Sequence, residues 1–333
     1  MMNSTNTDMG INGRQIAREL EKVISDESDI NVGMFTIKGA NTTILDASVR
    51  PDPDPLWKEL WYEGEVCCLF ADSNLGKSIY AVQIANEIAK SRKVLYFDFE
   101  LSDKQFQLRY TDDATRTLHK FPDNLYRVEI NQEAMFSTSA FEETIIKDIE
   151  EAALKTSAKV LIIDNLTYLC SAAEKGELAG ILMMRLMQLK RKYQLSILVL
   201  AHTPKRQLSM PITQNDLAGS KKLYNFFDSV FAIGKSAKDD NLRYIKQLKV
   251  RYGGHTYDSE NVIVCQIEKV GAFLQFTTIG YSTEYEHLKE RTDRDREQMA
   301  AEVKRLSLNG YSIRGIANEL NISKSKVDRL LKQ

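Results

Sequence analysis

Short apolar runs alternate with helix-like stretches through the middle of the chain. Runs typical of buried strands occur at 65–70, 93–99, 159–164 and 196–201. Helical patterns begin near Ser78, extend from about Ser102 to Arg109, and extend again from about Glu177 to Tyr193. Strands that alternate with helices indicate an α/β fold with a mainly parallel sheet covered on both faces. Later runs at 242–250, 262–270 and 273–279 predict an antiparallel extension at one sheet edge.

The two ends of the chain depart from this pattern. Pro51, Pro53 and Pro55 alternate with aspartates, a pattern that we expect to forbid regular helix and ladder pairing and that indicates an extended linker. Beyond Thr283 the sequence is highly charged and then helical. We therefore expect an N-terminal extension and linker at 1–55, a main domain at 56–282, and a charged linker with a helix-turn-helix at 283–333.

The helix-turn-helix expectation depends on start and stop signals. Ser312 and Ser323 are the expected N-caps of two helices, and Gly310 and Asn321 suit the turns before and between them. The expected inner faces consist of Met299, Val303, Leu306, Val327, Leu330 and Leu331. Three short helices with one shared apolar core follow from this spacing.

Charge is balanced over the whole chain but not within it. The 45 basic residues face 46 acidic ones, so the chain as a whole is not an obvious polyanion binder. From Lys304 to the end, seven basic and two acidic residues give a net charge of +5 over thirty residues. This local excess favours duplex DNA as a partner of the tail, with a protein-docking helical hairpin as the alternative.

Composition bounds the class of protein further. With 43% hydrophobic and 27% charged residues, the chain is typical of a globular protein. No apolar run approaches the roughly 18 residues of a membrane helix, and no apolar signal region opens the chain. We expect a cytoplasmic protein without a membrane partner. The four cysteines lie in apolar runs without C-x-x-C spacing, which predicts buried free thiols.

The strongest chemical signal is ADSNLGKS at 71–78, which follows an apolar run and precedes a predicted helix. A P-loop in this context binds phosphate through backbone N–H groups and the helix N-terminus. Lys77 is expected to contact the β and γ phosphates of ATP, and the Ser78 hydroxyl to hold Mg²⁺. Ala71 stands where the pattern has glycine, a departure that we expect the loop to tolerate. The expected nucleotide-binding residues are Asp72, Ser73, Asn74, Leu75, Gly76, Lys77, Ser78 and Ile79.

A second signal is the aspartate that ends the apolar run KVLIID. Asp164 follows a predicted buried strand, from which a carboxylate can reach the Mg²⁺ shell beside a P-loop. An aspartate in this position otherwise serves as a helix cap or turn residue. The P-loop upstream favours the metal-binding role.

Taken together, these motifs resemble the RecA-like P-loop ATPases. The resemblance runs from about Leu56 to Gly280 and includes FADSNLGKS, VLYFDFELSDKQFQLRY, LIIDNLTYL, LVLAHTPK, DLAGSKKLYNFFDSV and KVRYGG. It is closer to the DnaB-type and RepA-type hexameric helicases, and in particular to AAA-family ATPases of Bacteroides-type bacteria. The resemblance implies a RecA-like sheet, ATP and Mg²⁺ as cofactors, a hexameric homo-oligomer and action on DNA.

The resemblance also assigns roles to residues after the predicted strands. Glu100 matches the acidic residue that polarises the attacking water; its alternative is to cap the next helix, and Asp98 is the rival base. His202 matches a polar residue that senses the γ-phosphate, or else it is only a structural hydrogen-bonding group. Lys249 and Arg251 match a K-x-R element that reaches the neighbouring subunit's ATP, with an exposed basic strand face as the alternative.

Two regions are implied to contact DNA. The loop at 203–223, with Lys205 and Arg206, corresponds to one that lines the ring channel and contacts single strands; an ordinary mobile surface loop is the alternative. In the tail, Lys324, Lys326 and Arg329 are expected to face a duplex, because the spacing resembles a resolvase-type helix-turn-helix. These features predict a RepA/DnaB-like replicative helicase of a plasmid or mobile element. An ATP-gated DNA-binding switch without motor activity and a small-molecule phosphotransferase are the competing hypotheses.

Overall fold

The computed structural model describes residues 30–131, 133, 141–170, 176–203, 206–217, 221–289, 293–320 and 322–332. The chain forms two compact units, Met1–Pro53 and Asp54–Gln333. The described part of the first unit contains the antiparallel strands β1 (Ile30–Val32) and β2 (Phe35–Ile37), followed by helix α2 (Ala40–Ser48). None of the helices within the described ranges is long and apolar enough to cross a membrane.

The second unit is built on a nine-stranded sheet with the order β13-β12-β11-β10-β5-β9-β8-β6-β7. The strands are β5 (Val66–Ala71), β6 (Val94–Asp98), β7 (Leu125–Val128), β8 (Val160–Asp164), β9 (Ser196–His202), β10 (Ser229–Lys235), β11 (Leu242–Lys249), β12 (Val262–Val270) and β13 (Phe273–Ser282). The strands from β10 to β7 are parallel, and β11 to β13 extend the sheet in antiparallel fashion. The predicted fold class, a RecA-like mainly parallel sheet with an antiparallel edge extension, is therefore confirmed.

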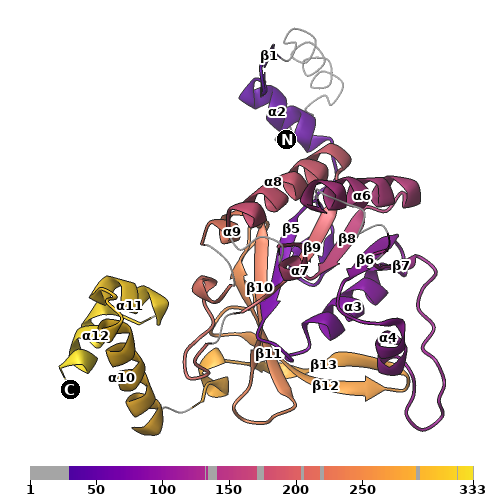
Figure 1. The fold of residues 1–333 in the computed structure, drawn as a ribbon. Helices are drawn as coiled ribbons and strands as arrows, with labels where there is room; N and C mark the ends of the chain where they lie inside the picture. The colour runs from indigo at the N-terminus through magenta and orange to yellow at the C-terminus, as the bar shows by residue number, and fades with distance from the viewer. Residues whose placement is uncertain are drawn as a thin grey trace, which may run out of the picture. The chain divides into compact units, whose positions relative to one another are not determined.

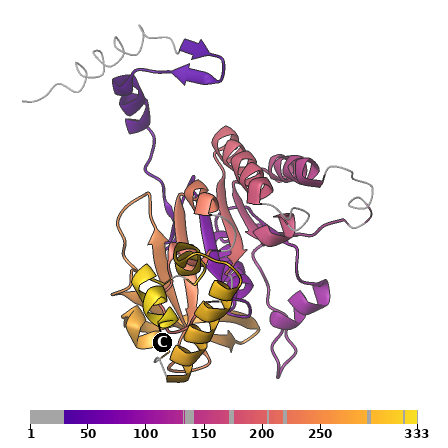
Figure 2. The ribbon, with the colours of Figure 1, turned by 60° about the vertical axis from the view of Figure 1, so that its left-hand side comes forward.

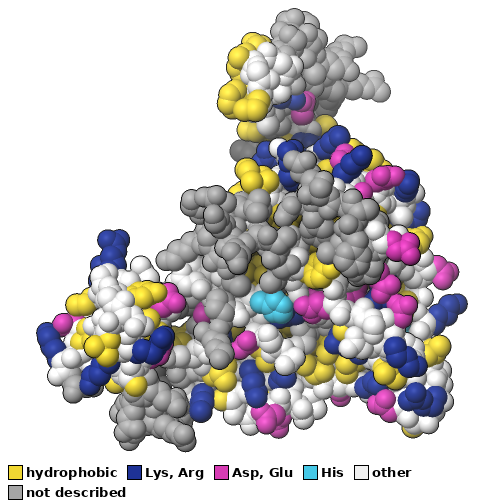
Figure 3. All heavy atoms as spheres, viewed as in Figure 1, with side chains coloured by type: hydrophobic (Ala, Val, Ile, Leu, Met, Phe, Trp, Pro, Cys, Tyr) yellow, Lys and Arg dark blue, Asp and Glu magenta, His cyan; other side chains and the backbone are white. Residues whose placement is uncertain are grey.

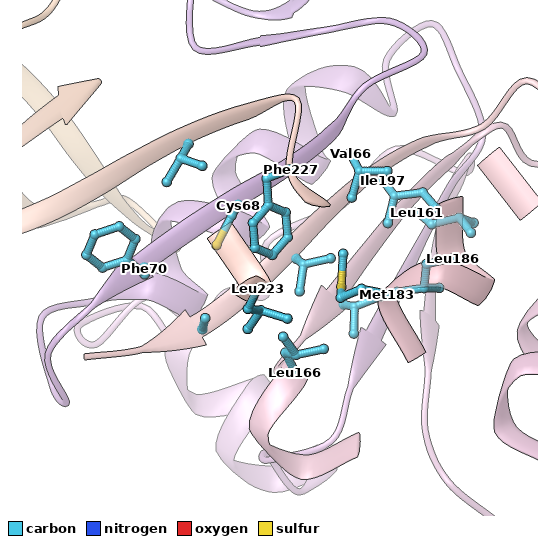
Figure 4. Close-up of a cluster of buried hydrophobic side chains, with 14 of the residues drawn as sticks. Val66, Cys68, Phe70, Leu161, Leu166, Met183, Leu186, Ile197, Leu223 and Phe227 are labelled. Carbon is cyan, nitrogen blue, oxygen red and sulfur yellow. The ribbon is translucent and has the colours of Figure 1, made fainter. Parts of the chain in front are cut away.

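Helices cover both faces of this sheet (Figure 1). They are α3 (Lys77–Ile88), α4 (Asp103–Arg109), α6 (Phe141–Thr156), α7 (Leu166–Cys170), α8 (Gly176–Tyr193) and α9 (Lys221–Phe226). Alternate residues of a strand point to opposite faces, and β5 illustrates the result. Val66, Cys68 and Phe70 lie in the core formed with Met183 and Leu186 of α8 (Figure 4). The intervening residues of β5 pack in a second core with α3.

The β12–β13 hairpin packs against α3 and against the glycine that precedes it. The Gln83 side chain donates to the Phe276 carbonyl at 3.0 Å and accepts from the Phe276 N–H at 2.8 Å. A Cβ atom added to Gly76 would come within 2.9 Å of Ile267 and of the Phe276 ring. The hairpin therefore fixes the position of the loop that leads into α3.

The three C-terminal helices are α10 (Asp293–Leu308), α11 (Ile313–Glu319) and α12 (Lys324–Leu331), and Figure 2 shows them from a second side. Both predicted caps are confirmed, since Ser312 accepts from Gly315 N–H and Ser323 from Lys326 N–H. Their shared core contains the predicted residues Met299, Val303, Leu306, Val327 and Leu330, with Leu331 packed against it. Asn321 lies outside the described residues, and whether these helices bind DNA stays a prediction.

Some elements differ from the sequence predictions. Strands β7 and β10 and helix α6 were not predicted. The expectation that the proline-rich stretch forbids ladder pairing is wrong at Pro55, which opens the short strand β3 (Pro55–Trp57) and pairs with Tyr62 of β4 (Trp61–Tyr62). Proline is tolerated as the first residue of such a strand. Cys67, Cys68 and Cys265 are buried free thiols as predicted, and the Cys170 side chain lies outside the described atoms.

Candidate functional site

The P-loop connects β5 to α3 at the carboxyl end of the parallel strands. Asn74 and Gly76 have left-handed backbone conformations, with φ of 63° and 92°. Gly76 is the N-cap of α3, and no side chain among the described residues caps this helix. The N–H groups of a helix's first turn have no partner within the helix and carry the positive end of its dipole. The loop and helix start therefore fit a phosphate group.

Neighbouring strand ends bring three more polar residues beside this loop. Strand β9 pairs with β5 so that His202 lies opposite Ala71, immediately before the loop. Asp164 at the end of β8 lies opposite Asp98 at the end of β6. Since parallel strands end at the same sheet edge, residues far apart in sequence converge here.

Lys77 is buried and its ammonium group turns back into the loop. Its Nζ donates to the Ala71 carbonyl at 2.9 Å and to the Asp72 carbonyl at 3.2 Å, and lies 3.2 Å from His202 Nδ1. Burial lowers the pKa of Lys77, against the attraction of nearby carboxylates such as Asp164. Burial and repulsion by Lys77 lower the pKa of His202, which favours the neutral imidazole.

Asp164 is buried and supported by two hydroxyl groups. Tyr96 Oη donates to Asp164 Oδ2 at 2.6 Å, and the Ser78 hydroxyl donates to the same carboxylate. Burial raises the pKa of Asp164 to about 6, although both hydrogen bonds oppose the rise. A hydroxyl beside a carboxylate supplies the hard oxygen ligands that Mg²⁺ prefers, so the residues present fit this ion. The described residues contain no group of three or more His, Cys, Asp or Glu side chains that could hold a metal.

The two candidate bases on β6 have different surroundings. Asp98 is buried, forms an ion pair with Arg127 at 2.9 Å, and accepts from the N–H groups of Glu100 and Leu101 at 3.2 and 3.0 Å. The Glu100 side chain is 44% exposed, so its carboxylate is accessible to water. The alternative that Glu100 caps the next helix is wrong, because Ser102 caps α4 through a capping box with Gln105.

Asn165 is a site residue that the sequence analysis missed. Its Nδ2 donates to Glu100 Oε1 and lies 3.1 Å from His202 Nε2. His202 Nε2 is itself 3.6 Å from Glu100 Oε1. The signal available in the sequence was only its position directly after Asp164, at the end of a predicted strand.

Lys249 and Arg251 lie near the amino ends of the parallel strands, whereas the P-loop lies at their carboxyl ends. Lys249 pairs with Val230, which pairs with Cys68, three residues before the end of β5. Since β11 runs antiparallel to β10, Arg251 continues further from the P-loop of its own chain. Its side chain is 57% exposed, and its guanidinium forms an ion pair with buried Asp228 at 3.0 Å.

The residues expected to contact DNA are only partly described. Lys205 lies outside the described residues. Arg206 is half-buried and donates to the Met210 carbonyl at 3.0 Å and to Tyr244 Oη at 3.4 Å. On α12, Lys324 and Arg329 are exposed and Lys326 is half-buried. Figure 3 shows Lys and Arg side chains distributed over the surface of the C-terminal helices.

The comparison with protein families decides the class of this site. A family model described as an AAA domain matches residues 39–207, slightly more than half of the chain. The chain belongs to this AAA-domain family. The matched region contains the P-loop, Glu100, Asp164 and His202, and together with the sheet topology it makes the chain a RecA-like P-loop ATPase. Enzymes of this class use ATP and Mg²⁺.

One solved structure is similar to this ATPase, and the similarity extends over most of the solved protein's chain. It is the KaiC-like protein PH0186 from the hyperthermophilic archaeon Pyrococcus horikoshii OT3, with a TM-score of 0.47 and 12% sequence identity over 65% of this chain and 91% of that chain. No curated protein matches the sequence.

Proposed function

We propose that this ATPase is a homo-oligomeric, hexameric motor that acts on DNA in the cytoplasm, as a replicative helicase of the RepA/DnaB type carried by a plasmid or mobile element. Lys77 and the loop residues 72–79 bind the phosphates of ATP. Ser78 and Asp164 hold Mg²⁺, which neutralises charge on the phosphates when it is bound. Glu100 is the catalytic carboxylate that orients the attacking water.

Glu100 suits this role because of what surrounds it. Water must be oriented in line with the γ-phosphate, which requires a carboxylate that is accessible yet close to the P-loop. Glu100 is exposed and 3.6 Å from His202, whose other ring nitrogen contacts Lys77. Asp98 is less suited, because its oxygens are already used by Arg127 and by two backbone N–H groups.

The position of Arg251 is the observation that carries the oligomeric part of the proposal. Arg251 is exposed at the amino ends of the parallel strands, away from the P-loop of its own chain. It therefore cannot assist hydrolysis within its own chain. In a head-to-tail ring, the surface at the amino ends of one subunit's parallel strands can face the P-loop of the next subunit. Arg251, with Lys249 beside it, would then stabilise transition-state charge in the neighbouring site.

A mixing experiment tests this arrangement. Arg251→Ala and Lys77→Ala subunits are each expected to lack turnover as pure proteins. In a 1:1 mixed ring, about one quarter of the interfaces combine an intact P-loop with an intact Arg251, so up to roughly a quarter of the wild-type rate should return. The matched control mixes Lys77→Ala with Glu100→Gln, which belong to the same site and should not complement. Absence of recovery despite demonstrated co-assembly would refute the shared site.

The DNA-binding part is tested separately. Turnover is measured without DNA, with single-stranded DNA and with duplex, together with the solution mass. Strong stimulation of a ring by single strands supports the motor. The second candidate, an ATP-gated DNA-binding switch, is favoured by the C-terminal helices, which have their own core and expose Lys324 and Arg329. Duplex binding with slow turnover and no single-strand stimulation would support that switch instead.

A further inference from the structure

We infer that Asn165 is a positioning residue that holds the Glu100 carboxylate for hydrolysis, an inference that rests on the proposed role of Glu100. Asn165 is buried, with 2% of its surface exposed, and it does not belong to the P-loop at 71–78. Its side chain nevertheless contacts both Glu100 and His202. It is therefore placed between the candidate base and the candidate phosphate sensor.

The orientation of the Asn165 amide follows from its partners. Its Oδ1 accepts from the Tyr168 N–H at 3.0 Å, which makes Asn165 the N-cap of α7. A backbone N–H can only donate and a carboxylate can only accept. Oδ1 must therefore face Tyr168, and Nδ2 must face Glu100. One side chain thus performs two separate tasks, a helix cap through its oxygen and a contact with the base through its nitrogen.

The contact matters because of where Glu100 lies. A glutamate side chain that is 44% exposed would otherwise sample several rotamers in water. A hydrogen bond to an ionised group is stronger than one between neutral groups. Asn165 is held by burial and by its cap bond to Tyr168, so its Nδ2 offers Glu100 a fixed donor beside the P-loop. The expected consequence is an increase in the fraction of molecules with Glu100 ready to orient water.

The neighbouring His202 extends this arrangement toward the phosphate. Its Nε2 faces Asn165 and Glu100, while its Nδ1 faces Lys77. Asn165, Glu100, His202 and Lys77 therefore form one continuous chain of polar contacts from the base to the P-loop. Of these four, Asn165 is the one whose inferred role, positioning the Glu100 carboxylate, requires no contact with nucleotide or with the attacking water.

Substitutions can separate the two tasks of Asn165. Serine caps a helix about as well as asparagine but is too short to reach Glu100, so Asn165→Ser keeps the cap and removes the contacts of Nδ2 with Glu100 and His202. Asn165→Asp also keeps a capping oxygen but places an acceptor where Glu100 needs a donor. Asn124→Ser is the matched control, because Asn124 donates to the Ala89 carbonyl at 3.2 Å and lies just before β7, at the amino ends of the parallel strands and away from the P-loop.

The experiment measures ATP turnover, KM and melting temperature for the full-length protein. For Asn165→Ser we expect kcat to fall by about 10- to 100-fold, with KM and melting temperature nearly unchanged. Asn165→Asp should lose at least as much turnover, and Asn124→Ser should keep wild-type turnover. An unchanged kcat in Asn165→Ser and Asn165→Asp would overturn the inference, as would an equal fall in the Asn124→Ser control.

A double-mutant cycle distinguishes positioning of Glu100 from an independent effect. In a Glu100→Gln background, Asn165→Ser should lower the residual turnover by less than about 3-fold, because the carboxylate that it positions is already gone. An equal loss in both backgrounds would refute the inference. If Glu100→Gln itself leaves turnover unchanged, the proposed role of Glu100 fails. If Glu100→Gln removes turnover but Asn165→Ser does not, only the role of Asn165 fails.

Discussion

Replacing Gly76 by alanine tests how tightly the P-loop is held by the sheet extension. Gly76 has φ of 92°, and an alanine in the left-handed region costs about 1–2 kcal/mol. The added Cβ would also come within 2.9 Å of Ile267 Cδ1 and of the Phe276 ring. The end of the isoleucine can rotate away, but Phe276 is 3% exposed and packs on Tyr80 at 4.9 Å between ring centroids.

The ring must therefore shift within a filled core, and overpacking of this kind costs roughly 1–3 kcal/mol. Gly76→Ala should lower the free energy of unfolding by about 2–5 kcal/mol in total. For a domain of this size, the melting temperature should fall by roughly 5–15 °C. Nucleotide affinity should fall as well, because the same displacement moves the N-terminus of α3.

Gly271→Ala is the matched control. Gly271 also has positive φ, 59°, but no described atom lies within 4 Å of its added Cβ, so only the backbone cost of about 1–2 kcal/mol applies. Thermal and urea unfolding of both variants separates strain from packing. Equal losses of stability in the two variants would refute the packing argument. In a Phe276→Leu background, the cost of Gly76→Ala should approach that of Gly271→Ala.

The remaining predictions concern nucleotide and DNA. Lys77→Ala should abolish tight MgATP binding measured by calorimetry, because the cation of the phosphate cradle is removed; unchanged affinity would contradict the P-loop assignment. Glu100→Gln should keep nucleotide binding but lower hydrolysis by a factor on the order of 100, and normal turnover in this variant would exclude Glu100 as the base. Lys324→Ala combined with Arg329→Ala should weaken duplex binding and reduce its log–log salt slope by roughly one unit per lost phosphate contact. Lys90→Ala, an exposed lysine of the ATPase domain, is the control, and equal salt slopes in all proteins would favour a docking role for the tail.

The sequence predicted most of the sheet because buried parallel strands are continuous apolar runs bounded by turns. Strand β10 escaped prediction, and Gly234 shows why. The Tyr244 ring of β11 covers it so closely that an added Cβ would lie 2.1 Å from that ring. Gly234 and Lys235 end the short apolar run 230–233, and a glycine inside a strand weakens the strand signal. The reason for this glycine lies in the neighbouring strand. The covering aromatic side chain cannot be assigned before the order of the strands is known.

The same limit applies to the candidate site. The P-loop follows an apolar run and Asp164 ends one, so local sequence was enough to propose them, and the resemblance to RecA-like ATPases added Glu100. The contact of Asn165 with Glu100 arises only because β8 and β6 are neighbours in the sheet. The pair formed by Asp98 and Arg127 likewise depends on β6 lying beside β7. Sequence patterns identified the candidate site residues, whereas the contacts between them required the strand order.

The two cations of the K-x-R element differ in their physical surroundings. Lys249 donates to the Tyr224 and Asn225 carbonyls near the end of α9, at 3.3 and 3.5 Å, and burial lowers its pKa. These contacts satisfy carbonyl groups that a helix end leaves open, so Lys249 supports α9 within its own chain. Arg251 uses one nitrogen for Asp228, and a guanidinium has five donors in all. The pair with Asp228 therefore orients Arg251 without using all of its donors, and in the proposed ring the remaining donors of Arg251 would be available to the phosphate of the neighbouring subunit.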